Sequence, residues 1–173
     1  KSDFTLYSAE LQHVWETPRY SLVIGGRWQW GDVDSQDTMT RVFPAIDESV
    51  SGSLERGNAY AYGSWQVFDP LRLIAGVSYD HLRYPDNADA PPLSTGESSS
   101  DLLAPKAGLI LEPWKGGVFR ASYTKSLGGL YFDNSVRLEP TQVAGFNQAF
   151  RSLIPESVVG LAPGTEFETI AVG

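Results

Sequence analysis

Carboxylates form the densest group of chemically active side chains in this sequence. The stretch GDVDSQD places Asp32, Asp34 and Asp37 close together. Carboxylates at this density can bind Ca²⁺, but an EF-hand loop also needs a glycine at its sixth position and a glutamate at its twelfth. Neither follows here, so a solvated acidic loop is the favoured interpretation, and calcium binding stays an open alternative.

Other chemistry has even less support in the sequence. His13 and His81 are the only histidines, and neither has a second ligand at metal-binding spacing. The serines include no Gly-x-Ser-x-Gly elbow, and the pair Gly128 and Gly129 lacks the strand-to-helix setting of a phosphate loop. Without cysteine there is no thiolate site and no disulfide. The sequence therefore predicts no enzyme and no cofactor, and it predicts no metal site apart from the open alternative of calcium at the acidic loop.

Composition narrows the class of protein. The chain has 173 residues, a formal net charge of -8 and 42% hydrophobic residues, which predicts an ordered domain and argues against a nucleic-acid partner. No run approaches the roughly 18 apolar residues of a transmembrane helix. A membrane-spanning β-strand, however, needs only about 9 to 11 residues and gives a weaker alternating signal.

Alternation of apolar and polar residues dominates the chain. It predicts strands at 4–16, 20–30, 58–68, 73–84, 103–112 and 117–126, with a seventh beginning at FETIAVG. Three connections are tight turns with proline at the second position, namely Pro18, Pro70 and Pro113. The other three are long segments, 31–57, 85–101 and 127–164. The order is tight, long, tight, long, tight, long.

This sorting of connections is typical of a barrel whose short turns lie on one rim and whose long loops lie on the other. It predicts an all-β fold, an antiparallel up-and-down meander that is part of a transmembrane outer-membrane β-barrel. On strand 20–30, Leu22, Ile24, Trp28 and Trp30 then face lipid. The opposite faces of the strands carry the expected lumen-facing residues, which are Arg27, Gln29, Asp80 and Arg120. A soluble β-protein that uses these aromatic residues as its core is the alternative.

Three stretches carry a family resemblance. APKAGLILEPWKGGVFRASYTKSLGG, at 104–129, resembles a barrel hairpin of TonB-dependent outer-membrane receptors. RLEPTQVAGFNQAFR, at 137–151, is similar to the Leu-x-Pro-Glu loop that re-enters the barrel in that family, with Thr141 where an acid is usual. SWQVFDPLRLIAGVSYD, at 64–80, has the same hairpin pattern.

The resemblance implies a protein of the bacterial outer membrane that takes up a scarce solute of the siderophore, cobalamin or glycan class. Such barrels have 22 strands around a plugged lumen. Residues 1–173 hold about seven strands and three long loops, with neither plug domain nor TonB box visible, so we expect a partial barrel segment. Its partners are then outer-membrane lipid, the solute, and an inner-membrane energising complex that acts through a plug not in this chain. An export barrel for polysaccharide and a soluble β-rich binding module are the alternatives.

The third long segment is the expected solute-binding region, because it is less polar than the other two and needs a cover for its apolar side chains. We expect it to fold partly into the barrel mouth. Phe146, Phe150 and Leu153 have helical spacing, so AGFNQAFRSLI is a candidate for a brief helix. A self-packed loop that only closes the rim is the other interpretation. The expected solute contacts are Tyr131, Phe132, Arg137, Phe146, Asn147 and Arg151.

Overall fold

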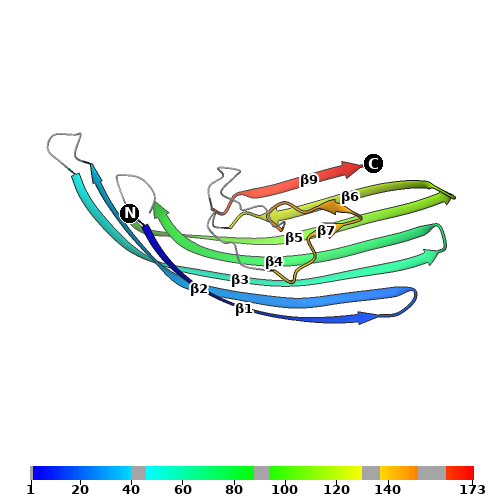
Figure 1. Cartoon of the computed structure of the whole chain (residues 1–173), viewed down its shortest axis with the longest axis horizontal. Coiled ribbons are helices and arrows are strands. Elements are labelled where there is room, and N and C mark those ends of the chain that lie inside the picture. Colours follow the sequence, from blue (N-terminus) through cyan, green and yellow to red (C-terminus); the bar gives the residue numbers. More distant parts are fainter. Residues whose placement is uncertain (1, 40–45, 88–93, 130–136, 152–162) are drawn as a thin grey trace.

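The computed structural model describes residues 2–39, 46–87, 94–129, 137–151 and 163–173. In these residues one antiparallel sheet has seven strands in the order β1-β2-β3-β4-β5-β6-β9, and it curves along its length (Figure 1). Strands β7 and β8 form a second, two-stranded sheet that shares no strand pairing with the first. The strands are β1 (Ser2–Glu16), β2 (Tyr20–Met39), β3 (Ile46–Phe68), β4 (Leu71–Asn87), β5 (Ser94–Trp114), β6 (Gly117–Leu127), β7 (Gln142–Val143), β8 (Phe146–Asn147) and β9 (Glu166–Val172).

The predicted meander is confirmed. Each of the six predicted strands lies within an observed strand, and sequential strands pair from β1 to β6. The first two proline turns connect β1 to β2 and β3 to β4. The third differs, because Pro113 falls within the irregular end of β5 and the chain reverses at Lys115 and Gly116. Gly116 takes a φ of 88°, a left-handed conformation that glycine adopts without strain. None of the described residues forms a helix long and apolar enough to cross a membrane.

Two of the expected long loops are mostly strand. β2 continues to Met39 and β3 begins at Ile46, so the predicted loop 31–57 is an extension of both strands. Likewise β4 continues to Asn87 and β5 begins at Ser94, where the sequence predicts a loop from 85 to 101. The prediction was wrong because glycine, serine and aspartate usually mark loops. Here they alternate with buried apolar residues such as Val33, Val50 and Leu54. Residues 40–45 and 88–93 lie outside the described residues.

The two faces of the sheet exchange character along the strands. We call the face that carries Trp28 and Trp30 the outward face, and the opposite one the inner face. Near the tight turns the outward face is apolar and the inner face is polar, as Arg27, Arg56 and Asp80 show. Farther along, the outward face carries exposed Asp32, Asp34, Ser51 and Ser53, whereas the inner face carries buried Val33, Val50, Leu54, Leu82 and Leu102.

The boundary between the two halves runs obliquely across the sheet. Coming from the tight turns, the first polar outward residues are Asp32, Glu55, His81, Asp101, Lys125 and Glu168 on β2, β3, β4, β5, β6 and β9. Strand pairing shows how far this boundary moves toward the tight turns from each strand to the next, in the order β2, β3, β4, β5, β6 and β9. The shifts are two, two, zero, four and zero residues, or eight residues over five strand-to-strand steps. With about 3.3 Å per residue and about 4.8 Å between strands, this slope corresponds to a strand tilt of about 48°.

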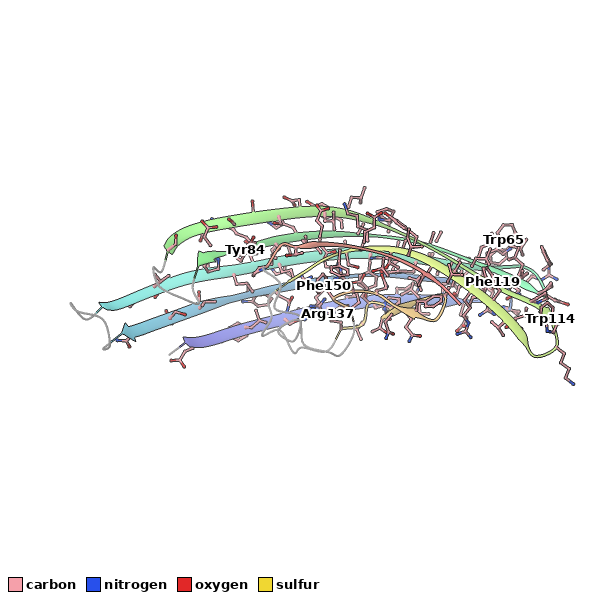
Figure 2. All side chains as sticks on the ribbon, turned by 90° about the horizontal axis from the view of Figure 1, so that it is seen from above. Trp65, Tyr84, Trp114, Phe119, Arg137 and Phe150 are labelled. Atoms are coloured by element: carbon pink, nitrogen blue, oxygen red, sulfur yellow. The ribbon has the colours of Figure 1, made fainter. Side chains whose placement is uncertain are left out.

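Aromatic residues gather at both limits of the apolar stretch. Tyr7 stacks on Trp30 near the boundary, and Tyr20 stacks on Trp65 near the tight turns, with ring centroids 5.9 and 6.1 Å apart. Trp65, Trp114 and Phe119 lie at the tight-turn end of the sheet (Figure 2). Among the described outward residues between these limits, His13 on β1, paired with Ile24, is an exception to the apolar character.

Candidate functional site

Residues 137–151, which we call the docked segment, fold back onto the inner face of the sheet (Figure 1). Their core is the β7-β8 hairpin, in which Val143 pairs with Phe146. The turn between them is Ala144 and Gly145, with φ of 52° and 86°. Two consecutive positive φ angles are typical of a type I′ hairpin turn. The brief helix expected here was therefore wrong for the described residues, because the Ala-Gly turn reverses the chain before a helical turn forms.

A glycine on β5 makes room for this hairpin. A Cβ added at Gly108 would lie 2.9 Å from Val143 Cγ1 and 3.0 Å from Ala144 Cβ, too close for a real contact. Val143 is buried against Tyr60 and Tyr62 on β3, with Val23 and Ile74 packed at the side. Phe150 adds a second apolar contact, because its ring meets the Phe167 ring of β9 edge-on with centroids 5.6 Å apart. The Val143 and Ala144 side chains therefore lie in the space that the missing Cβ of Gly108 leaves free.

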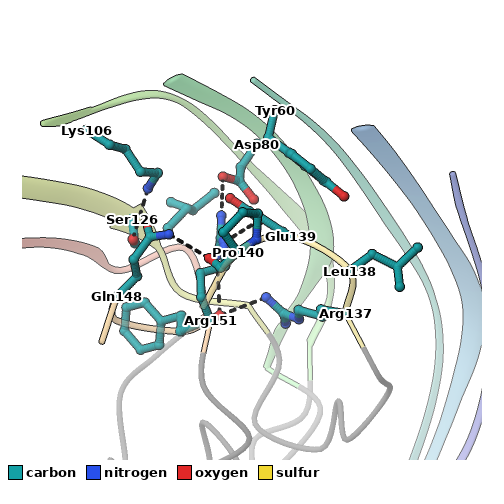
Figure 3. Close-up of polar contacts among 12 residues, drawn as sticks. Tyr60, Asp80, Lys106, Ser126, Arg137, Leu138, Glu139, Pro140, Gln148 and Arg151 are labelled. Carbon is teal, nitrogen blue, oxygen red and sulfur yellow. Dashed lines mark hydrogen bonds and ion pairs between the residues drawn. The ribbon is translucent and has the colours of Figure 1, made fainter. Parts of the chain in front are cut away.

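A buried ion-pair network joins the docked segment to the sheet through Arg151 and Asp80. Arg151 Nη2 lies 2.6 Å from Asp80 Oδ2 on β4, and Arg151 Nε lies 2.6 Å from Glu139 Oε2 in the docked segment (Figure 3). Arg56 Nη2 approaches the other Asp80 oxygen at 3.4 Å. The three residues Arg151, Asp80 and Glu139 are each at most 3% exposed. Buried charges of this kind are stable only when they are paired.

Hydrogen bonds extend the network to the backbone of the docked segment. The Tyr62 hydroxyl donates to Glu139 Oε1 at 2.7 Å, and Gln148 Nε2 donates to the Tyr62 hydroxyl at 3.1 Å. Gln148 Nε2 also donates to the carbonyl of Pro140 at 2.7 Å. Gln148 thus ties the two ends of the hairpin to one phenol on β3.

The first strand holds the other side of the docked segment. Glu10 on β1 accepts hydrogen bonds from the backbone amides of Leu138 and Glu139 at 2.9 and 3.2 Å. Gln12 Nε2 donates to the carbonyl of Leu138 at 2.6 Å. Within the segment, Arg137 Nη1 donates to the carbonyl of Phe150 at 2.8 Å. The segment is therefore fixed to β1, β3, β4 and β5 together.

The space left between these side chains is small. A cavity of about 10 Å³ lies among residues of the sheet and of the docked segment, which are Glu10, Arg27, Gln29, Arg56, Asn58, Asp80, Arg137 and Glu139. Such a volume admits about one water molecule and no organic solute. The network is therefore an anchor for the segment, and a solute would have to bind on surfaces that it holds in place.

The comparison with known proteins agrees with this architecture. A family model described as the TonB-dependent receptor-like β-barrel matches residues 40–157, more than half of the chain. The chain belongs to this family. No curated protein and no solved structure gives a significant match. TonB-dependent receptors are transporters of the bacterial outer membrane and not enzymes.

The expected lumen residues of this receptor barrel all lie on the inner face. Arg27, Gln29 and Asp80 are buried there, and Arg27 Nε donates to Ser8 Oγ at 3.1 Å. Arg120 lies closer to the tight turns and is exposed. A Cβ added at Gly145 would lie 2.7 Å from Arg120 Nη1, so this guanidinium borders the hairpin turn.

The structure places the expected solute contacts in two groups, one in the buried anchor and one on the hairpin strand β8. Arg137 and Arg151 belong to the anchor, whereas Phe146 is half-buried and Asn147 is exposed on β8. Asn147 Oδ1 accepts a hydrogen bond from Gln142 Nε2 at 2.8 Å. Tyr131 and Phe132 lie outside the described residues.

The sequence reasoning missed Glu10, Arg56, Tyr62, Glu139 and Gln148. The only signal for any of them was the Leu-Glu-Pro stretch that contains Glu139.

The acidic residues on the outward face form no metal site in the part of the chain that the structure describes, where no three histidine or acidic side chains group together. Asp34 Oδ1 accepts a hydrogen bond from Ser51 Oγ at 2.6 Å. Asp101 accepts hydrogen bonds from the Tyr79 hydroxyl at 2.6 Å and contacts His81 Nδ1 at 2.8 Å. These two contacts, Tyr79 first, lower the pKa of Asp101.

Proposed function

We propose that this chain forms a section of the wall of a TonB-dependent receptor that imports a scarce solute of the siderophore, cobalamin or glycan class. The observation that carries the proposal is the docked segment. It joins β6 to β9 at the end of the sheet opposite the tight turns, yet it is anchored deep on the inner face by Arg151, Asp80 and Glu139. A segment held in this way narrows a lumen and presents side chains to whatever enters it.

The polarity of the sheet supports a membrane position for its tight-turn half. On β2 the outward residues from Tyr20 to Trp30 carry no charge, and these ten residue steps are about 33 Å long. With the tilt of about 48° given above, their height is about 22 Å, close to the roughly 25 Å apolar band of outer-membrane barrels. The stacked aromatic pairs then lie at the two membrane interfaces, where aromatic girdles are found.

Strand length supports the same placement. β3 has 23 residues and is therefore about 76 Å long, whereas a crossing needs only about 9 to 11 residues. The half beyond the boundary, polar outside and apolar inside, has the pattern of a sheet in water. We infer that this half projects from the outer membrane on the side of the longer connections.

The edges of the sheet support a larger barrel. In the described residues β1 and β9 are edge strands, each paired on one side only. Unpaired backbone groups within lipid cost several kcal/mol each, so spanning sheets close into barrels. We therefore propose that further strands complete the wall. A plug outside this chain would link the receptor to the inner-membrane energising complex.

Solute contacts are proposed on the exposed side of the docked segment, with Phe146 and Asn147 as the described candidates and Arg137 at their base. Arg151 is proposed to position this surface, because two carboxylates already occupy its guanidinium. Export of a polysaccharide is the second candidate function. The anchored segment favours import, because a bound solute needs a fixed surface whereas an exported chain needs a continuous path.

The test uses the intact receptor in a strain from which its gene has been removed. Uptake of a labelled ferric siderophore, cobalamin and an oligosaccharide is measured with and without a protonophore. The variant lacks residues 134–155, and its control is the substitution Thr141→Ala on the exposed part of the same segment. Heat-modifiable mobility on gels reports barrel assembly.

We expect uptake of one solute class to require energy and to be lost in the assembled deletion variant, while the control keeps it. Loss of polysaccharide from the cell surface without any change in uptake would favour export. Unchanged uptake of all three solutes in an assembled variant would overturn the proposed role of the segment.

A further inference from the structure

A groove lies on the outward face close to the tight turns. It has a volume of about 640 Å³, within the range of small-molecule sites. Its floor is Gly63 on β3 and Ala75 on β4, which pair with each other in the sheet. Trp15 and Leu22 border it on one side, and Trp65 and Leu73 border it toward the turns.

Strand pairing explains the shape. Leu22 pairs with Gly63, and Gly63 pairs with Ala75, so this row has a large side chain on β2 but almost no side-chain bulk on β3 and β4. The next row toward the turns is Tyr20, Trp65 and Leu73, whose large side chains form a wall. The stacking of Tyr20 on Trp65, with an interplanar angle of 12°, keeps this wall rigid.

Gly63 is not needed for the backbone. Its φ lies outside the left-handed region, and a Cβ added there would find its nearest neighbour, the Ala75 carbonyl oxygen, at 3.9 Å. An alanine or larger residue would fit without strain. The absence of a side chain at 63 therefore serves to keep the groove open, since nothing in the local geometry demands glycine.

We propose that this groove holds one acyl chain of a phospholipid from the leaflet at the tight-turn side. The inference rests on the membrane position given under the proposed function, because the groove is continuous with the outward apolar band. An apolar groove of about 640 Å³ between the exposed rings of Trp15, Tyr20 and Trp65 fits a single hydrocarbon chain, whereas a stable protein partner needs roughly 800 Å² of complementary surface on each side.

The mouth of the groove suits the lipid headgroup. Arg19 is exposed in the adjoining turn, beside Tyr20, whose ring is part of the wall. A guanidinium at this level can pair with a lipid phosphate, and the phenol can remain at the interface while its ring contacts hydrocarbon. Charge and apolar surface are thus arranged in the order in which a phospholipid presents them.

The test fills the groove without changing the lumen. The intact receptor is purified as wild type, Gly63→Leu and Ala59→Leu, washed stepwise in detergent, and bound phospholipid is counted by mass spectrometry. Ala59 is exposed on the same face and strand, so it is a matched control for added apolar bulk. We expect Gly63→Leu to lose one tightly bound phospholipid that the wild type and Ala59→Leu retain. We expect Arg19→Gln to weaken its retention.

Two further readouts keep the result unambiguous. Tryptophan quenching by phosphatidylglycerol brominated on its acyl chains, in nanodiscs, should be weaker in Gly63→Leu than in Ala59→Leu. If Gly63→Leu fails to assemble, Ala75→Val fills the same floor and replaces it. Equal phospholipid counts in assembled proteins would refute the groove as a lipid site, and so would a dimer that only Gly63→Leu disrupts. A receptor that fractionates outside the membrane would instead refute the proposed function.

Discussion

Removal of the Arg151 side chain is the most direct test of the anchor. In Arg151→Ala, Asp80 and Glu139 stay buried but lose the cation that both of them contact at 2.6 Å. Breaking a buried ion pair by deleting one partner costs about 3–5 kcal/mol. Asp80 keeps Arg56 at 3.4 Å and Glu139 keeps the Tyr62 hydroxyl at 2.7 Å, so we expect the lower end, about 3 kcal/mol.

This cost should fall on the docking of residues 137–151 and not on the barrel wall. The segment can leave the sheet and allow water to reach the two carboxylates, while the ladders from β1 to β6 persist. A change of about 3 kcal/mol corresponds to an opening equilibrium shifted about 100-fold, which hydrogen exchange measures directly. The amide of Gln148, which donates to the Thr141 carbonyl at 2.8 Å, is a suitable reporter.

Two variants make the measurement specific. Arg151→Lys retains the charge but loses the planar fork that contacts two carboxylates, so its exchange should lie between wild type and Arg151→Ala. Arg72→Ala removes an exposed arginine on the same face whose side chain contacts Gln66, and it should leave hydrogen exchange at the Gln148 amide unchanged. If exchange in Arg151→Ala stays within threefold of the wild-type rate, the ion pairs do not hold the segment and the reasoning fails.

Three further predictions concern the packing of the hairpin on Gly108, the apolar outward face, and Asp101 at the polar boundary. Gly108→Val should displace the hairpin and expose residues 142–147 to protease without any change of charge, because its Cβ would lie 2.9 Å from Val143 Cγ1. Unchanged resistance of these residues to protease would contradict the role of Gly108 in hairpin packing. Ile24→Arg should lower barrel stability in a folding assay by about 2–4 kcal/mol, whereas Ser53→Arg, outward but beyond the boundary, should cost under about 0.5 kcal/mol; equal costs would contradict the lipid face. Because the pKa of Asp101 is lowered in the folded protein, its contribution to stability is present above its unfolded-state pKa and is lost as pH falls through its folded-state pKa. The Asp101→Asn variant should therefore show a smaller acid-induced drop in melting temperature than the wild type.

The strands of the tight-turn half were predictable because apolar outward and polar inner residues alternate strictly there. Trp28 and Trp30 alternate with Arg27 and Gln29, and one misplaced residue would reverse both faces. The extensions beyond the boundary were not predicted, since serine, glycine and aspartate there share the composition of loops. In hindsight, the spacing of Val33, Val50 and Leu54 within those polar stretches was the available signal.

The anchor could not be predicted from local patterns. Arg151 and Asp80 are 71 positions apart, and Glu10 contacts the amide of Leu138 across 128 positions. No periodicity links such residues, and Glu139 and Gln148 look like ordinary loop residues until the hairpin brings them to Tyr62. Helical spacing of Phe146 and Phe150 was also misleading, because the two left-handed residues before Phe146 decided the local fold.

The polar inner face explains why the segment is anchored by charge. A soluble domain would fix such a segment by burying apolar surface, but in the tight-turn half the inner face carries Arg27, Arg56 and Asp80, and its apolar contact with the hairpin is limited to the cluster around Tyr60 and Tyr62. The hydrophobic contribution is therefore limited, and specificity has to come from ion pairs and hydrogen bonds with fixed geometry. Beyond the boundary the inner face becomes apolar at Leu82 and Leu102, so a segment there could pack in the ordinary way. The depth at which the docked segment lies thus determines the chemistry of its attachment, and moving Asp80 to the level of Leu82, as in the double variant Asp80→Leu and Leu82→Asp, should abolish docking even though the composition is unchanged.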